Sequence, residues 1–200
     1  MTSFYKTALF VSFFLFGTVN VQATILTTAT NIDNGYQSFI STDDNAAGTL
    51  FGSGASWPTT FIDTVSLTAG VTNYLHISAY DQGGIAMLLG EFTLSDTDFE
   101  FANGTQSMLS GDAGLLVSLT GFGSNYNATT DLGINGTSPW GFKSQVDSSA
   151  RYVWSADANN DNQTYFSVAI NSTTVPEPTT LSLFALAIIG LGFSRRKLSK

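Results

Sequence analysis

The sequence predicts an all-β domain, a jelly roll or β-sandwich, flanked by a short apolar segment at each end of the chain. Three observations favour this fold. Apolar and polar residues alternate with a period of two, turn-forming residues separate the alternating stretches, and the composition is rich in Thr, Ser, Gly and Asn but poor in Lys. Such a composition favours strands and turns over helices.

The clearest strand lies at residues 73–81, where Leu75, Ile77 and Ala79 point to one face and the residues between them to the other. Residues 60–67 alternate in the same way, and residues 85–94 are apolar enough for a central strand. Further strands are expected at residues 25–29, 37–40, 49–51, 115–120, 152–155 and 164–170. Many short strands at this spacing are typical of sandwiches and jelly rolls.

Turn signals rich in Gly, Asn and Asp separate the expected strands. They occur at residues 33–35, 52–54, 68–70, 81–84, 103–104, 135–136 and 157–162. Residues 121–139 resemble one long loop, of a kind that is often functional or mobile.

The N-terminal segment has the three parts of a secretory signal peptide. Lys6 supplies the positive charge, residues 8–17 supply the apolar stretch, and small residues ending at Ala23 supply the cleavage site. We therefore expect residues 1–23 to be removed after export through the Sec translocon. Residues 24–174 then form one domain of ordinary size.

The charge of this domain excludes some partners. It contains fourteen acidic residues but only Lys143 and Arg151 as basic ones, a formal net charge of −12. Such a surface repels nucleic acid and anionic lipid, so we expect neither as a partner. The sequence has no Cys, and an exported domain of this size must then be stabilised by burial instead of disulfides.

The C-terminal region begins with an extended motif made of Val175, Pro176, Glu177 and Pro178. Proline has no backbone N–H and disfavours helix in the residue before it, so this motif stays accessible to a protease. An uncharged apolar stretch follows at residues 181–193. Together these features favour a cleavage site just outside a membrane segment.

A transmembrane helix is expected at residues 179–194. Its length of about 24 Å is short against the hydrocarbon core of about 30 Å, so the anchor is marginal. The basic cluster Arg195, Arg196 and Lys197 follows and should stay in the cytoplasm. An accessible motif, a marginal helix and a basic stop indicate sorting and cleavage.

These three parts, in this order over residues 175–200, resemble the PEP-CTERM sorting signal. The resemblance implies that an exosortase, a membrane cysteine transpeptidase, recognises the Pro-Glu-Pro sequence and removes the helix. It further implies a Gram-negative-type bacterium that makes exopolysaccharide. The chain would be anchored in the bacterial membrane transiently and then reside at the cell surface or in the extracellular matrix. The alternative is an ordinary short tail anchor.

A second resemblance covers the body of the chain. Asp43-Asp44, the glycines of residues 52–54, the strand at residues 73–81 and Gly83-Gly84 are similar to the pattern of galactose-binding-like jelly rolls. Residues 70–73 depart from it, because the Gly-x-Asn turn of that pattern is one residue shorter. The resemblance implies the fold and says little about a ligand.

Most catalytic arrangements are excluded by residue type. With no Cys and a single His, neither a Cys–His pair nor a His-based metal cluster can form. A Ser–His–Asp triad would need His76, which is expected in the middle of a strand and is better suited to packing or hydrogen bonding. Paired carboxylates could serve a glycosidase, and the available ones are Asp43, Asp44, Glu91, Asp98 and Glu100. We expect no enzyme activity and no required cofactor.

Calcium is the one cofactor with a candidate site. Asp157, Asn159 and Asp161 match the first three ligand positions of a calcium loop. Asn162 and Val168 then occupy positions where an EF-hand needs Gly and Glu, so an EF-hand is excluded. A looser site of Asp side chains and backbone carbonyls stays open, against the alternative of an Asn/Asp-rich turn.

Two tryptophans are candidates for glycan binding, because sugar sites place an aromatic face beside a few polar groups. Trp57 precedes Pro58 in a Gly/Ser-rich stretch, and Trp140 follows Pro139, so both are expected to be more exposed than Trp154. Trp154 lies in an apolar strand and is expected in the core. Covering the core is the alternative role for Trp57 and Trp140.

Three hypotheses from different classes follow. The first, which we favour, is an exported, exosortase-processed structural or adhesive protein of the cell envelope or extracellular matrix, associated with exopolysaccharide and without catalysis. The second is a carbohydrate-binding module on the cell surface. The third is an enzyme that acts on polysaccharide.

Overall fold

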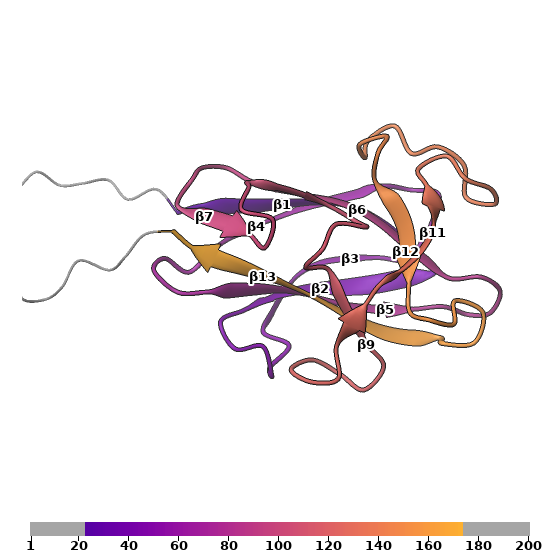
Figure 1. Ribbon diagram of the computed structural model, residues 1–200, viewed down its shortest axis with the longest axis horizontal. Helices are drawn as coiled ribbons and strands as arrows, with labels where there is room; N and C mark the ends of the chain where they lie inside the picture. The colour runs from indigo at the N-terminus through magenta and orange to yellow at the C-terminus, as the bar shows by residue number, and fades with distance from the viewer. Residues whose placement is uncertain (1–22, 174–200) are drawn as a thin grey trace, which may run out of the picture.

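Alternating apolar residues meet between two antiparallel sheets in the computed structural model, which describes residues 23–173 (Figure 1). All strand pairs are antiparallel, and residues 23–173 contain no helix. The all-β sandwich expected from the sequence is therefore confirmed. The predicted signal peptide up to residue 22, the motif at 175–178, the helix at 179–194 and the basic cluster at 195–197 lie outside the described residues.

Sheet 1 has the strand order β11–β12–β6–β1–β4, with β8 paired to β6. Its strands are β11 (Thr130–Ile134), β12 (Arg151–Trp154), β6 (Met87–Leu94), β1 (Ile25–Asp33), β4 (Phe61–Ser66) and β8 (Ser107–Leu109). Sheet 2 has the order β10–β9–β13–β5–β2–β3, with β7 paired to β13. Its strands are β10 (Asn127–Ala128), β9 (Leu116–Ser118), β13 (Gln163–Ser172), β5 (Asn73–Tyr80), β2 (Gly35–Ser41), β3 (Thr49–Gly54) and β7 (Phe99–Phe101).

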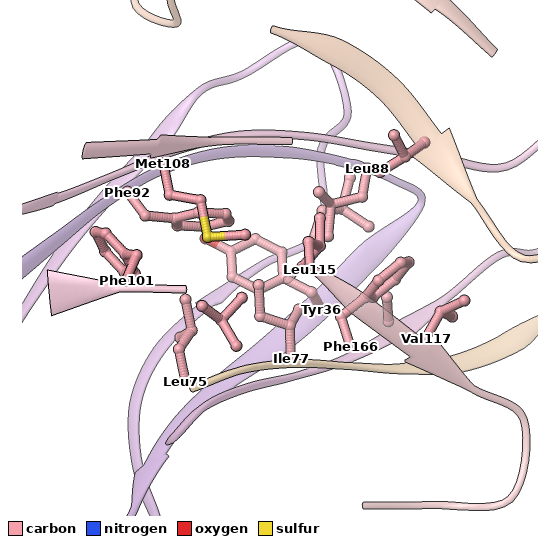
Figure 2. Close-up of a cluster of buried hydrophobic side chains, with 14 of the residues drawn as sticks. Tyr36, Leu75, Ile77, Leu88, Phe92, Phe101, Met108, Leu115, Val117 and Phe166 are labelled. Atoms are coloured by element: carbon pink, nitrogen blue, oxygen red, sulfur yellow. The ribbon is translucent and has the colours of Figure 1, made fainter. Parts of the chain in front are cut away.

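The main core lies between the two sheets. Leu75 and Ile77 of β5 and Phe166 of β13 gather with Leu88 and Phe92 of β6, and all five side chains are fully buried (Figure 2). Burial of one such side chain contributes about 1.5–3 kcal/mol, so this layer is the chief source of stability in a domain without disulfides. The alternation predicted at residues 73–81 is confirmed.

β6 is buried on both faces, as its continuous apolar run predicts. Met87, Leu88 and Leu89 are all fully buried, because residues 135–150 cover the outer face of sheet 1 and form a second apolar cluster there. Trp154 of β12 lies in the main core, with its ring edge-on to Phe166 at a centroid separation of 5.4 Å. Its predicted core position is confirmed.

Two expectations about loops were wrong. Residues 52–54 were expected to form a turn, but they belong to β3, an edge strand. Glycine is needed there for close packing: a Cβ on Gly52 would lie 2.4 Å from the carboxylate of Asp63, and a Cβ on Gly54 would lie 2.5 Å from the ring of Phe61. The expected long loop at residues 121–139 contains β10 and β11, which are short and lack a clear alternation.

β1 runs from one end of the sandwich to the other (Figure 1). The two ends are built from different parts of the chain. At the terminal end, Thr24 Oγ1 donates to Asp96 Oδ1 (2.7 Å), and the backbone N–H of Thr173 donates to the Asp98 carbonyl (2.9 Å). Both ends of the described chain therefore meet at the same turn, residues 95–98. The opposite, distal end is formed by the last residues of β1, the 55–60 loop and residues 135–147.

Residues 23–173 contain no helix that is long and apolar enough to cross a membrane. The predicted helix at residues 179–194 falls outside this range.

Candidate functional site

Side chains at the end of β1 hold two aromatic loops at the distal end. Asn31 Nδ2 donates to the backbone carbonyl of Trp57 (3.1 Å), and Asn31 Oδ1 accepts from Thr60 Oγ1 (2.9 Å), which fixes the 55–60 loop. Asp33 Oδ2 accepts from the indole N–H of Trp140 (3.1 Å). The fold thus brings Trp57 and Trp140, which are far apart in the sequence, into one apolar cluster.

Trp140 is buried, and the exposure expected for it was wrong. Only 4 % of its surface is exposed, and its ring packs against Tyr152 with centroids 4.9 Å apart. Burial raises the pKa of Asp33, and the hydrogen bond from Trp140 partly opposes that rise. Trp140 therefore has no free face for a ligand and instead anchors residues 135–150 to sheet 1.

Lys143 completes the distal end and was not singled out from the sequence. Its Nζ lies 4.6 Å from the centroid of the Trp57 ring, and the residue is only 8 % exposed. Burial lowers the pKa of the Lys143 ammonium, and the nearby Asp33 carboxylate opposes that effect. Such a cation–π contact is worth about 0.5–2 kcal/mol. The only signal in the sequence was that Lys143 is one of two basic residues in the domain.

Asn135 holds the segment that contains Lys143. Its Nδ2 lies 3.0, 3.1 and 3.2 Å from the carbonyl oxygens of Lys143, Val146 and Asp147, and its Oδ1 accepts from the Lys143 N–H (2.9 Å). Asn135 itself is 6 % exposed. One buried amide, with two donor hydrogens and one acceptor oxygen, therefore contacts four backbone groups of a loop that has no regular structure.

The distal end can offer a ligand an aromatic edge beside charged groups. Trp57 is partly exposed, although the Lys143 ammonium covers one face of its ring. Phe142, the residue before Lys143 in the chain, is 61 % exposed. Aromatic surface beside a few fixed polar groups is the usual arrangement of a sugar-contacting surface.

A second polar cluster lies on the outer face of sheet 2. His76 is fully buried there, with Nδ1 3.2 Å from the Ala47 carbonyl oxygen and Nε2 3.0 Å from Asp44 Oδ1. The same carboxylate oxygen accepts from Tyr126 Oη (2.9 Å) and Ser167 Oγ (3.0 Å). These contacts fasten the loops before β3 and after β9 onto the sheet.

This cluster holds the three residue types of a hydrolytic triad without its geometry. Ser167 Oγ donates to Asp44 and not to His76, and the Nδ1 atom of His76 faces a carbonyl oxygen, which only accepts. A triad requires the serine hydroxyl to hydrogen-bond to the imidazole. Phe122 also stacks on the His76 ring at 4.1 Å and covers it. The cluster fits the hydrogen-bonding role expected for His76.

The carboxylates named for a glycosidase are distributed over different parts of the fold. Asp43 and Asp44 lie in the loop before β3, and Glu91 lies on β6, where it accepts from the Asp147 N–H (2.9 Å). Asp98 and Glu100 are at the terminal end beside β13. Within residues 23–173, no group of three or more His, Cys, Asp or Glu side chains could hold a metal ion.

The residues proposed for calcium form a turn after β12. Asp157 accepts from the Asn159 N–H (3.2 Å) and from Asn160 Nδ2 (2.8 Å), whereas Asp161 Oδ2 accepts from Ser155 Oγ (2.7 Å). The backbone carbonyl of Asp161 also accepts from the indole of Trp154 (2.9 Å). These contacts fit an Asn/Asp-rich turn, and calcium binding by Asp157, Asn159 and Asp161 stays a prediction.

Comparison with known proteins identifies the C-terminal region. Residues 174–197 match the family model of the PEP-CTERM protein-sorting motif. No curated protein and no solved structure matches the chain. The resemblance proposed for residues 175–200 is thereby confirmed, whereas the galactose-binding-like resemblance of the body stays a prediction.

The motif shows an exported protein that is anchored in the membrane and then processed by exosortase. Ala23, the predicted last residue of the signal peptide, is exposed and immediately precedes the buried Thr24. Cleavage after Ala23 stays a prediction. Its position suits removal of the leader without a change to the folded domain, because Thr24 hydrogen-bonds to the sandwich through Asp96.

Proposed function

We propose that this protein is a structural or adhesive component of the cell envelope or extracellular matrix of a Gram-negative bacterium, associated with exopolysaccharide and without catalysis. The observation that supports the proposal most is the PEP-CTERM sorting motif at residues 174–197. Sorting by this route leads from the membrane to the cell exterior. The domain that precedes the motif then works outside the cell.

The two-ended architecture supports this proposal. The sorting motif directly follows Thr173, which is hydrogen-bonded to the turn at the terminal end. The domain would therefore be held by its terminal end while the distal end, with Trp57 and Phe142, faces away from the point of attachment. Matrix contacts at the distal end would not interfere with processing of the tail.

The chemistry of the domain also favours a role without catalysis. The single histidine of the chain is buried beneath Phe122, and its ring nitrogens face the Ala47 carbonyl and the Asp44 carboxylate. General base catalysis needs a group within reach of a substrate proton. A net charge of −12 keeps the domain soluble outside the cell without a nucleic-acid partner.

The sorting step is tested by intact mass. The protein is purified from wild-type cells and from cells without their exosortase, and its mass is measured. We expect a species running from Thr24 to near Pro178 in wild-type cells only. An unprocessed tail in both strains would instead indicate a plain membrane anchor and would contradict the proposal.

The matrix role is tested by removing the tail. A chain that ends at Thr174 should be exported but lost to the medium, with reduced aggregation of the cells and less protein in the extracellular polymer. Purified protein should not hydrolyse the cells' own polysaccharide. An unchanged cell phenotype, or release of reducing sugar by the pure protein, would count against a structural role.

Carbohydrate binding is a second candidate function, favoured by the exposed aromatic residues at the distal end. Trp57 and Phe142 are the residues that could touch a sugar, while Trp140 would position them from beneath. Trp57→Ala should abolish glycan-array signals, whereas Leu119→Ala, at a residue that is 51 % exposed elsewhere, should leave them unchanged. A wild-type protein that binds no glycan would exclude this candidate.

A further inference from the structure

The two sides of the sandwich differ in how directly the chain connects the edge strands of the two sheets. On one side, β10 ends sheet 2 and β11 ends sheet 1, and a single residue, Thr129, separates them. The chain thus passes from one sheet to the other and closes this side. On the opposite side, β3 ends sheet 2 and β4 ends sheet 1, and within residues 23–173 each pairs with one strand only.

An edge strand presents unpaired N–H and C=O groups, which form a template for another strand. β4 is the better template of the two. Its sequence, Phe-Ile-Asp-Thr-Val-Ser, contains three β-branched residues among six, whereas β3 contains glycine at positions 52 and 54. β-branched residues favour strands and glycine weakens them.

The open side is also almost free of charge. Residues 45–80 include β3, β4 and β5, and Asp63 is their only Asp, Glu, Lys or Arg. Asp63 is partly buried, and its Oδ2 accepts a hydrogen bond from Tyr36 Oη (3.1 Å). On a domain with a net charge of −12, one partly buried carboxylate over residues 45–80 means that a second, equally acidic copy meets little repulsion from these strands.

Apolar side chains are exposed at the same place. Ile62 of β4 is 55 % exposed and Leu50 of β3 is 51 % exposed. A shallow groove of about 330 Å³ runs between the two strands and is lined by Leu50, Phe51, Gly52, Ser53 and Asp63. An edge with exposed Ile and Leu, whose single charged side chain, Asp63, is partly buried, is the kind of surface through which sheets join edge to edge.

We propose that two copies of this chain associate through β4, which pairs antiparallel with β4 of the second copy and joins the two copies of sheet 1 into one sheet. The proposed structural role in the envelope or matrix would then include self-association of the protein. The pairing does not depend on glycan binding. A symmetric antiparallel pair places the same strand on both sides of a twofold axis.

The pairing register follows from the side chains of β4. Residues that face each other must lie on the same face, because successive side chains alternate. Centring the pair on Asp63 would place two carboxylates directly opposite each other, which is unfavourable. Centring it on Thr64 keeps five residues paired, places Ile62 opposite Ser66, and places Asp63 opposite Val65. We therefore expect Thr64 to face Thr64 of the second copy.

Cysteine cross-linking in the full chain tests this register, because the natural chain has no Cys. Thr64→Cys should form a disulfide-linked dimer on the cell surface, since opposed residues have Cβ atoms about 4.5–5.5 Å apart, and the short end of this range meets the roughly 3.5–4.5 Å of a disulfide. Ser66→Cys is the matched control: it is exposed on the same face of the same strand, but its copies would lie too far apart for a disulfide. Dimers are counted on non-reducing gels.

The expected result is at least about tenfold more dimer for Thr64→Cys than for Ser66→Cys, because paired cysteines react at the high effective concentration of a formed complex. Equal amounts from both variants would indicate random collision and would overturn the proposal. Monomer from both would show that β4 does not pair with β4 of a second copy, and would overturn the proposal too. The mass of the processed tail, measured on the same samples, reports separately on sorting.

Discussion

Replacement of Asn135 by Ala should destabilise the distal end more than any other change of a polar side chain there. The Asn135 amide has two hydrogens for the three carbonyl oxygens of Lys143, Val146 and Asp147, and its Oδ1 accepts from the Lys143 N–H. This amounts to about three full hydrogen bonds, each worth about 1 kcal/mol net. We expect the free energy of unfolding to fall by about 3 kcal/mol.

Thermal unfolding of the purified protein measures this loss. A domain of this size changes its melting temperature by about 2–4 °C per kcal/mol, so Asn135→Ala should lower it by about 6–12 °C. Asn127→Ala is the control, because Asn127 is exposed and its Nδ2 has one contact, to the Asn125 carbonyl (3.2 Å). A melting temperature within about 2 °C of the wild-type value would refute the view that Asn135 holds this loop.

Three further predictions concern the sandwich itself. Thr28 is fully buried, and its hydroxyl has no hydrogen-bonding partner among the described residues, so Thr28→Val should stabilise the protein by about 1 kcal/mol; a lower melting temperature would contradict this. Gly52→Ala would place a Cβ 2.4 Å from a carboxylate oxygen of the facing edge strand and should cost about 1–3 kcal/mol in urea unfolding; an unchanged midpoint would show that the two edges are loosely packed. The hydroxyl of Thr24 is the main cause of the lowered pKa of Asp96, so the stability gained from that carboxylate is present above its ordinary value of 3.8 and is lost as the pH falls through the lowered pKa. Thr24→Val should move the pKa of Asp96 back toward 3.8, which an NMR titration of the carboxyl group would detect or exclude.

Strands with strong local patterns could be predicted from the sequence. Residues 73–81 and 60–67 alternate clearly, and the observed strands β5 and β4 have the faces expected for them. β6 was expected as a central strand because its apolar run suits burial on both sides. Short strands were missed, since three residues such as those of β7 or β8 show too little periodicity to be distinguished from a loop.

The candidate site depends on contacts between segments that are distant in the sequence. The sequence names Trp57 and Trp140 as exposed candidates for glycan binding, but nothing in the residues around Trp140 indicates that Asp33 accepts its indole N–H or that Tyr152 packs on its ring. Lys143 was missed for the same reason. Its position over Trp57 depends on how residues 135–150 fold back over sheet 1, which is a long-range event.

The sequence by itself determined the features that depend on residues close to one another in the chain. The sorting motif at residues 174–197 is recognised by consecutive residues, and the all-β class follows from a period of two and from turn residues. Only the tertiary structure decided which side chains meet. Asp44 and His76 come together, both ends of the domain meet at residues 95–98, and β3 and β4 are left as open edges, because each of these depends on strand pairing between segments distant in the chain.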